Sequence, residues 1–374
     1  MTLEEEFDQR NNALNAWRLT LATGVILWHS FLLTGHHLSY PPVHQLIREA
    51  WVDGFFAVSG FLITASWLGN PRLRTYFAAR GLRILPGLWA CLIVTAFVIA
   101  PIGVAIQGGS AAKLLLSRAP IEYVLKNSAV AWLQPDVGGT PQGIPWQHGW
   151  DAPLWTLIWE VFCYIAIAGL GVTGLLTRRW FIPVALAMAL YWSAVAPPWS
   201  IFDENPPAAQ PDVDVAAVMQ ALGNAGARFA VMFLAGAFLY QFRNVIPARW
   251  SFVAASAVVV LAASMLPNYR VVAAIPLAYA IIASGALVHN KRFRLRTDLS
   301  YGIYIYACPI QQLLVICGVR GLNPIVFAII ATIATVPVAA LSWNLVEKRA
   351  MSIKSRLKQR AISREKTSVV PESG

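Results

Sequence analysis

Hydrophobic residues are gathered into long blocks along most of the chain, and the gaps between the blocks are rich in Arg, Gly and Pro. The blocks are about 18 to 25 residues long. At about 1.5 Å per helical residue, such a block can cross a hydrocarbon core of roughly 30 Å. The pattern therefore predicts an all-α, polytopic integral membrane protein.

We expect about ten transmembrane helices. The fifth and seventh predicted spans are short, and the sixth carries Arg228 near its start, so these three are the least regular. The predicted spans are 16–33, 51–68, 84–106, 154–176, 181–195, 227–242, 252–266, 271–288, 299–319 and 325–345.

Composition and charge agree with a membrane protein. The chain is 57% hydrophobic and 13% charged, against about 25% charged residues in a typical soluble domain. Lys and Arg are concentrated in the gaps after even-numbered spans and in the C-terminal tail, and such residues accumulate on the cytoplasmic side. Both termini are thus predicted to be cytoplasmic. The same rule accounts for the net charge of +11 without any nucleic-acid partner.

Two predicted outer segments are longer than a connection requires. Residues 107–153 include an amphipathic stretch at 121–132 that could lie flat on the membrane surface. Residues 200–220 are rich in Pro and Asp and predict a mobile loop. The acidic segment 1–8 precedes a block without a cleavage signal, so we interpret the first block as a retained span.

The cysteines do not suggest a disulfide framework or a metal site. All four lie inside apolar blocks, with no CxxC pair and no histidine cluster beside them. They are Cys91, Cys163, Cys308 and Cys317.

Arg18 and His29 are ionisable residues inside the first predicted span. They are 11 residues apart, which places them on one face of a helix, with His29 roughly 16 Å farther from the cytoplasm. A neutral imidazole suits proton abstraction from a hydroxyl because its unperturbed pKa is about 6.5. The alternatives are a histidine hydrogen-bonded between helices and an arginine that anchors the span at the interface.

Asp53 lies at the outer end of the second predicted span, and Ser59 and Gly60 lie about two turns deeper. Asp53 could orient His29 or cap its own helix. Small residues such as Ser59 and Gly60 also allow close helix packing.

Glu160 lies inside the fourth predicted span, and Tyr164 follows four residues later on the same helix face. A carboxylate at that depth is costly, which favours a functional role. Arg80 and Arg83 lie three residues apart at the cytoplasmic start of the third predicted span. Two guanidinium groups there could bind phosphates, and they could equally be anchors of the positive-inside type.

These residues together resemble the motifs of the membrane-bound acyltransferase 3 family of bacterial O-acyltransferases. The resemblance covers nearly the whole chain and keeps the order of the motifs. The matching segments are Arg18 with His29, then 53–62 with its Ser-Gly-Phe-Leu stretch, Arg80 with Arg83, 155–164, 299–310 and 343–348.

The resemblance implies transfer of an acyl group, commonly acetyl from acetyl-CoA, to a hydroxyl of a carbohydrate or another extracytoplasmic acceptor. His29 would be the general base, with Glu160 or Asp53 holding or polarising it. The remaining site residues are Arg18, Arg80 and Arg83 for the CoA phosphates, and Ser59, Trp155 and Tyr164 for the substrate.

The expected protein is thus a multi-pass enzyme of the bacterial inner membrane. It would have acyl-CoA and a glycan or glycolipid as substrates, and no permanently bound cofactor or metal. Residues 1–347 would form the transmembrane domain, and 348–374 a basic, disordered cytoplasmic tail. The chain is expected to act as the stand-alone form, without the hydrolase domain of the SGNH type fused to some members.

One position departs from the family pattern. Many members carry a histidine shortly before the proline of the ninth span, where this chain has Tyr306, Ala307 and Cys308 before Pro309. Any role for that position is absent or moved.

Two other classes of protein also fit the polar residues. A proton-coupled transporter of a sugar or organic acid is the main alternative, because intramembrane His, Arg and Glu also mark carriers. The chain shows no obvious inverted repeat, which lowers this alternative. A scaffold protein of a polysaccharide assembly system is the other.

Overall fold

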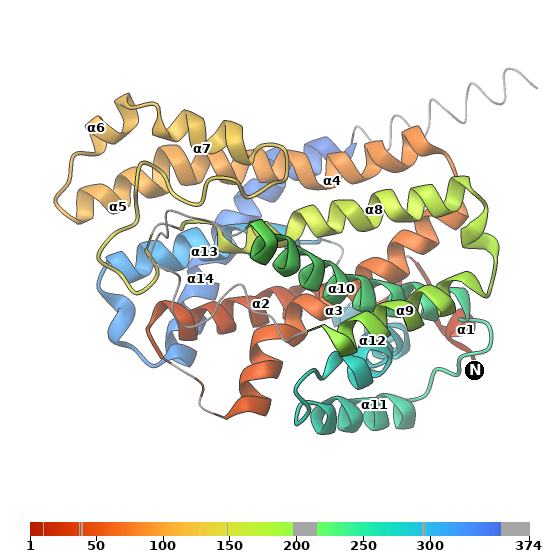
Figure 1. Cartoon of the computed structure of the whole chain (residues 1–374). Helices are drawn as coiled ribbons and strands as arrows, with labels where there is room; N and C mark the ends of the chain where they lie inside the picture. Colours follow the sequence, from red (N-terminus) through yellow and green to blue (C-terminus); the bar gives the residue numbers. More distant parts are fainter. Residues whose placement is uncertain are drawn as a thin grey trace, which may run out of the picture. The chain divides into compact units, whose positions relative to one another are not determined.

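The computed structural model describes most of the chain (Figure 1). The described residues are 1–9, 11–36, 38, 40–147, 149–196, 215–293, 295 and 297–352, and within them the side chains of 215–221 and Lys291 are not described. The described part is helical, with no β-strand, which confirms the prediction of an all-α protein.

Seven helical segments are long and apolar enough to cross a membrane: Leu14–Leu33, Pro41–Gly69, Leu73–Ile106, Ala152–Val172, Leu222–Gln241, Arg270–Leu287 and Pro324–Ser352. Three shorter apolar helices lie between them: Phe181–Val195, Trp250–Ala263 and Ser300–Ile316. Each predicted span overlaps one of these segments. The protein is therefore a polytopic membrane protein, while the count of ten crossings and the side of each terminus stay predictions.

The chain divides into two compact units. Unit 1 comprises residues 1–25, 38–69 and 159–298, and unit 2 comprises 26–37, 70–158 and 299–374. One boundary falls inside α2 (Leu14–Leu33), after Val25, and another falls near the start of α8 (Leu157–Val172), after Ile158. Both helices therefore contribute residues to both units.

Unit 1 is built around α3 (Pro41–Gly69), α10 (Val215–Gln241) and α12 (Arg270–Leu287), which pack on one another. Glycines allow α3 and α10 to approach closely. A Cβ on Gly60 would lie 1.9 Å from the Phe233 carbonyl oxygen, and one on Gly236 would lie 1.9 Å from that of Ala57. This contact confirms that a small residue at Gly60 permits close helix packing.

The remaining helices of unit 1 are short. Helix α9 (Phe181–Val195) packs on α10, and α11 (Trp250–Ala263) packs on α12. The N-terminal helix α1 (Leu3–Glu6) is capped by Thr2 and buries Leu3, so the acidic N-terminal segment is folded into unit 1.

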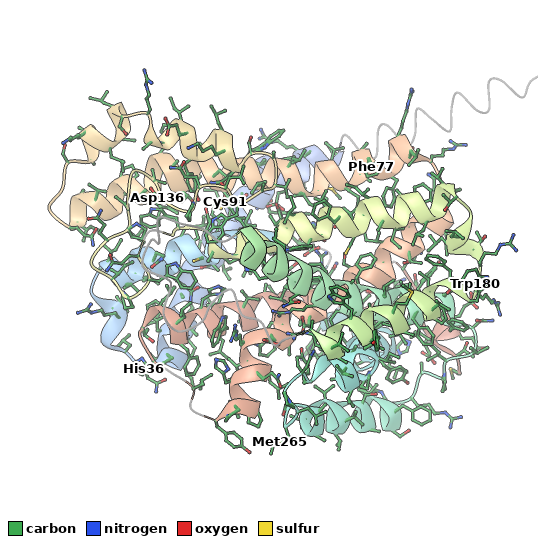
Figure 2. The ribbon with its side chains drawn as sticks, viewed as in Figure 1. His36, Phe77, Cys91, Asp136, Trp180 and Met265 are labelled. Atoms are coloured by element: carbon green, nitrogen blue, oxygen red, sulfur yellow. The ribbon has the colours of Figure 1, made fainter. Side chains whose placement is uncertain are left out.

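Unit 2 is centred on α13 (Ser300–Ile316), which packs on α14 (Pro324–Ser342) and on the helix formed by α4 (Leu73–Val94), η1 (Thr95–Ile99) and α5 (Ala100–Ile106). Pro309 interrupts the backbone hydrogen bonds of α13 because it has no N–H. The Ile305 carbonyl, which would accept that bond, instead accepts one from Cys91 of α4, labelled in Figure 2 (Sγ to O, 3.3 Å).

The predicted amphipathic outer segment contains two short helices, α6 (Ala111–Leu116) and α7 (Ala119–Asn127), which pack on each other. Helix α7 also packs on α4, and the irregular chain that follows it carries Asp136 (Figure 2). Leu125 and Ile121 are exposed on α7, as expected of a helix with one apolar face.

Several predicted boundaries differ from those in the structure, because helices extend farther than predicted. Helix α3 begins at Pro41, so Asp53 lies well inside it and does not cap it. The predicted loop 200–220 lies outside the described residues up to 214, and the residues from Val215 belong to α10. Of the predicted tail, residues 348–352 continue the last helix, and 353–374 lie outside the described part.

Candidate active site

Glu160, Tyr164 and Ser59 form one polar cluster within unit 1, which we call the Glu160 cluster. The Tyr164 hydroxyl donates a hydrogen bond to Glu160 Oε1, as the predicted four-residue spacing on α8 allows. Ser59 Oγ of α3 donates to the same oxygen at 3.4 Å. The carboxylate is half-buried and is held by two hydroxyl groups from two helices.

Asp53 belongs to a different group of unit 1, the Asp53 network, in which two carboxylates meet two arginines. Arg228 Nε of α10 lies 3.1 Å from Asp53 Oδ1, and Arg270 Nε of α12 lies 2.6 Å from Oδ2. Arg270 also pairs with Glu49, one turn before Asp53 on α3. Asp53 is fully buried, and each of the two carboxylates has an arginine partner.

Tyr269 completes the Asp53 network by donating a hydrogen bond to Asp53 Oδ2. Burial and the negative charge of Asp53 raise the pKa of Tyr269, so its hydroxyl keeps the proton that it donates. Both oxygens of Asp53 thus have donors from within unit 1. The predicted role of Asp53 toward His29 stays a prediction.

Arg18, on the unit 1 part of α2, forms an ion pair with Asp298 at the end of unit 1. Both side chains are partly accessible, with 23% of Arg18 and 12% of Asp298 exposed. The pair is therefore mostly buried, and part of each side chain stays accessible.

His29 lies on the unit 2 part of α2 and is buried. The adjacent Ser30 is also buried, and its hydroxyl donates to the Ile26 carbonyl at 2.7 Å. Gln311 of α13 contacts the same turn of α2 through its side-chain amide. The predicted base thus sits in a fixed, largely desolvated part of unit 2.

Arg80 and Arg83 occupy the first half of α4 in unit 2, each near an aromatic ring. The Arg80 guanidinium carbon lies 5.9 Å from the centre of the Tyr76 ring, and that of Arg83 lies 5.8 Å from the centre of the Tyr301 ring. Stacking of this kind orients a guanidinium plane while leaving N–H groups to bind an anion. Trp155, in the 3₁₀ turn η2 (Ala152–Thr156), is half-buried in the same unit.

Sequence reasoning missed one buried acidic site of unit 2. Asp151 is fully buried and accepts a hydrogen bond from the Tyr123 hydroxyl at 2.6 Å. Burial raises the pKa of Asp151 to about 7, and the donated hydrogen bonds offset only part of this increase. The only signal in the sequence is a carboxylate immediately before a predicted span.

The structure therefore sorts the predicted residues into groups. Glu160, Tyr164 and Ser59 come together, whereas Asp53 and Arg18 each have other partners within unit 1. His29, Trp155 and the pair on α4 belong to unit 2. Arg228, which makes the sixth predicted span irregular, and Arg270, which directly precedes the predicted span 271–288, both form ion pairs with Asp53.

Comparison with known proteins agrees with the resemblance seen in the sequence motifs. The chain matches the acyltransferase domain of the acyltransferase 3 family over residues 11–344. It is 26% identical over 360 residues to an O-acetyl transferase of Shigella phage Sf6, covering 91% of this chain and 96% of the relative. It is also 26% identical over 370 residues to Nodulation protein 10 of Rhizobium leguminosarum bv. viciae, covering 96% and 98%. No solved structure matches the chain.

The family match spans nearly all of the described helices and contains every predicted site residue. It confirms the family that the motifs resemble and makes the transporter and scaffold alternatives unnecessary. The chain belongs to the acyltransferase 3 family and is a multi-pass membrane acyltransferase.

Proposed function

We propose that this acyltransferase moves an acetyl group from acetyl-CoA to a hydroxyl of a carbohydrate or another extracytoplasmic acceptor, in the bacterial inner membrane. The name of the phage relative, O-acetyl transferase, supports acetyl as the group and oxygen as the acceptor atom. The basic gaps of the sequence support entry of an anionic donor from the cytoplasmic side.

The reaction needs a base for the acceptor hydroxyl, and His29 is proposed for this role. The O–H bond of the acceptor and the C–S bond of the thioester break, while a C–O ester bond and the S–H bond of CoA form. The imidazole takes the hydroxyl proton and can return it to the leaving thiolate, so the proton balance closes within the site. Burial of His29 supports the proposal because water is largely kept from the imidazole.

The Glu160 cluster is the single observation that carries the proposal. An ionisable carboxylate in an apolar helix is costly unless it has partners, and Glu160 has hydroxyl groups rather than a cation as its partners in the described part of the chain. Among the residues that the structure describes, none therefore neutralises its negative charge. We assign it the role of binding or polarising the groups that react, with Ser59 and Tyr164 setting its orientation.

The arginines are proposed to bind the phosphates of CoA. Arg80 and Arg83 can supply bidentate hydrogen bonds from one helix surface. Arg18 would exchange Asp298 for a phosphate oxygen, which is feasible because the pair is partly exposed. Trp155 is proposed to contact the substrate through its half-buried ring.

Asp53 is proposed to act through position rather than chemistry. Both of its oxygens are occupied by donors from α10, α12 and Tyr269. A carboxylate held in this way fixes α3, the helix that also carries Ser59 of the Glu160 cluster. Its contribution to the reaction would therefore be indirect.

The test compares wild-type protein with His29→Ala in detergent, measuring release of free CoA from acetyl-CoA with and without glycans extracted from the source cells. His36→Ala is the matched control, because His36 (labelled in Figure 2) is exposed just after α2 and its ring contacts the hydroxyl of nearby Thr34. Thermal melting is followed for all three proteins.

We expect glycan-dependent release by the wild type and His36→Ala, and a loss of about 10²-fold or more in His29→Ala with an unchanged melting temperature. Equal release by all three proteins would remove His29 from the mechanism. Release by none of them would contradict acetyl-CoA as donor or a glycan as acceptor.

A further inference from the structure

Helix α13 carries two adjacent glutamines, Gln311 and Gln312, just after Pro309. Both side chains are fully buried, at 0% exposure. The Nε2 atom of Gln311 donates to the Ile26 carbonyl at 3.0 Å and to Ser30 Oγ at 2.9 Å. Because a carbonyl oxygen can only accept, the contact with Ile26 fixes the Gln311 amide with its nitrogen toward α2 and its oxygen away from that contact.

Through this contact, Gln311 of α13 meets the part of α2 that carries His29. Residues 26, 29 and 30 are spaced i, i+3 and i+4, so their side chains share one side of the helix. Ile26 and Ser30 define the side that meets α13, and His29 lies between them in sequence on that side. All of these residues belong to unit 2, so the arrangement lies within one compact unit.

The Oε1 atom of Gln311 is buried and has no hydrogen-bond partner among the residues that the structure describes. An unsatisfied buried carbonyl costs about 1 to 3 kcal/mol, and native proteins fill nearly all such positions with a protein group, a water or a ligand. The unsatisfied acceptor therefore indicates a missing donor beside the Gln311 amide, the group that also contacts the α2 turn that carries His29.

We propose that Gln311 is a positioning residue for the acyl transfer. Its Nε2 holds the α2 turn that carries His29, and its Oε1 accepts a hydrogen bond from the acceptor substrate. The donor is a second hydroxyl or an N–H beside the hydroxyl that His29 deprotonates, so the substrate class is a diol, a sugar or an acylamino sugar rather than a simple alcohol. This inference rests on the proposed role of His29.

Gln312 provides a matched control on the next residue of the same helix. It is equally buried, and its Oε1 also lacks a partner. Its Nε2, however, donates to the Trp146 and Gly149 carbonyls of the outer segment, at 3.1 and 2.6 Å, rather than to α2. The same substitution at the two positions thus separates loss of a buried amide from loss of the link to the His29 turn.

The experiment measures CoA release with acetyl-CoA and extracted glycans for Gln311→Leu and Gln312→Leu, together with melting temperature. In Gln311→Leu we expect kcat to fall about 10²-fold and the KM for glycan to rise, with the KM for acetyl-CoA unchanged. Gln312→Leu should keep kcat within a few-fold of the wild type. Wild-type kinetics in Gln311→Leu, or an equal loss in both variants, would overturn the inference.

A second variant, Gln311→Glu, decides the question if the leucine variant does not fold. A protonated carboxyl can donate to Ile26 and accept from the substrate as the amide does, whereas the carboxylate cannot donate. Activity relative to wild type should therefore fall as pH rises from about 6 to 9, the range where buried glutamates ionise. Gln312→Glu should show no such fall, and a constant ratio for Gln311→Glu would contradict the proposal.

Failure of this inference can be told apart from failure of the proposed function. If His29→Ala is inactive while Gln311→Leu behaves as wild type, only the role of Gln311 is wrong. If His29→Ala is fully active, the proposed role of His29 and the role of Gln311 that rests on it are both wrong.

An activity-independent measurement covers the case in which no glycan supports release. In protein labelled at histidine, the ring signal of His29, identified by its absence from His29→Ala, should move in Gln311→Leu and stay in place in Gln312→Leu. An unmoved signal in Gln311→Leu would overturn the positioning role.

Discussion

Unit 1 contains two buried or half-buried carboxylate sites that differ in how their charge is compensated. In the Asp53 network, Asp53 and Glu49 face Arg228 and Arg270, so each carboxylate is paired with a cation. In the Glu160 cluster, the donors are the hydroxyls of Ser59 and Tyr164, which carry no charge. A neutralised network is suited to hold helices together, and an uncompensated carboxylate is suited to meet a substrate.

The two sites differ in whether the cost of placing a carboxylate in the membrane is offset by charged partners, a difference that the sequence alone does not reveal. Inside a membrane every ionisable residue suggests function, because its insertion costs free energy. In the Asp53 network, ion pairs with arginines of neighbouring helices offset this cost. A role in catalysis or binding is therefore better supported for Glu160 than for Asp53, although both are acidic residues in apolar helices.

The largest effect is expected from breaking the Asp53 network. Asp53→Ala leaves the buried Arg270 and the partly buried Arg228 with Glu49 as the remaining carboxylate, and removal of one partner of a buried ion pair costs about 3 to 5 kcal/mol. We expect a large drop in melting temperature and in the yield of folded protein. A variant that melts as wild type does but is inactive would instead make Asp53 a catalytic residue.

The next effect is on activity alone. Glu160→Gln keeps the shape of the side chain and an oxygen that both hydroxyls can donate to, so stability should change by less than about 1 kcal/mol. CoA release should fall about 10²-fold or more, as expected when a polarising charge is lost. A loss of stability as large as that of Asp53→Ala would remove the distinction between the two sites.

A smaller effect is expected from Tyr164→Phe, which removes one donor from the Glu160 cluster and leaves Ser59 in place. A hydrogen bond to a charged group is worth about 1.5 to 3 kcal/mol, so activity should fall roughly 10- to 100-fold through misorientation of the carboxylate. Steady-state kinetics on folded protein measure this. Activity equal to wild type would mean that Ser59 alone orients Glu160.

The smallest effect concerns Asp151 of unit 2, a buried carboxylate with a hydroxyl donor, Tyr123. Its pKa is raised to about 7 from an ordinary value of 3.8, so the folded state binds more protons than the unfolded state between these values. This residue's contribution to stability is therefore present below about pH 4 and is lost as pH rises through about 7.

Asp151→Asn should thus raise the melting temperature relative to wild type by a few degrees at pH 8, and by less at pH 5. Asp136→Asn, a change in the same outer segment (Figure 2), is the control and should not alter the pH dependence. A wild-type melting temperature that rises between pH 5 and 8, with Asp151→Asn following it in parallel, would contradict the assignment.

Most of the fold could be predicted from hydrophobic blocks, because helix length is set by the thickness of the membrane. The positions at which helices begin and end were less predictable. Helix α3 extends to Pro41 through a polar first segment that hydropathy excludes, and this extension carries Glu49 of the Asp53 network.

The contacts within the Glu160 cluster are partly local and so were partly predictable. The spacing of Glu160 and Tyr164 on one helix anticipates their hydrogen bond, whereas the contact with Ser59 joins residues far apart in sequence. The partners of Asp53 come from α10 and α12, and no local pattern brings Arg228 or Arg270 to it. Gln311 is likewise inconspicuous in the sequence, because its significance lies in contacts with α2.

The most direct test of the central claim is the transfer of label from radiolabelled acetyl-CoA to extracted glycan, with the product then treated with mild alkali. We predict that the wild type produces labelled glycan, that alkali releases the label as expected of an O-acetyl ester, and that His29→Ala and Glu160→Gln transfer almost none while remaining folded. Labelled glycan formed equally by these variants, or label that resists alkali, would contradict the account.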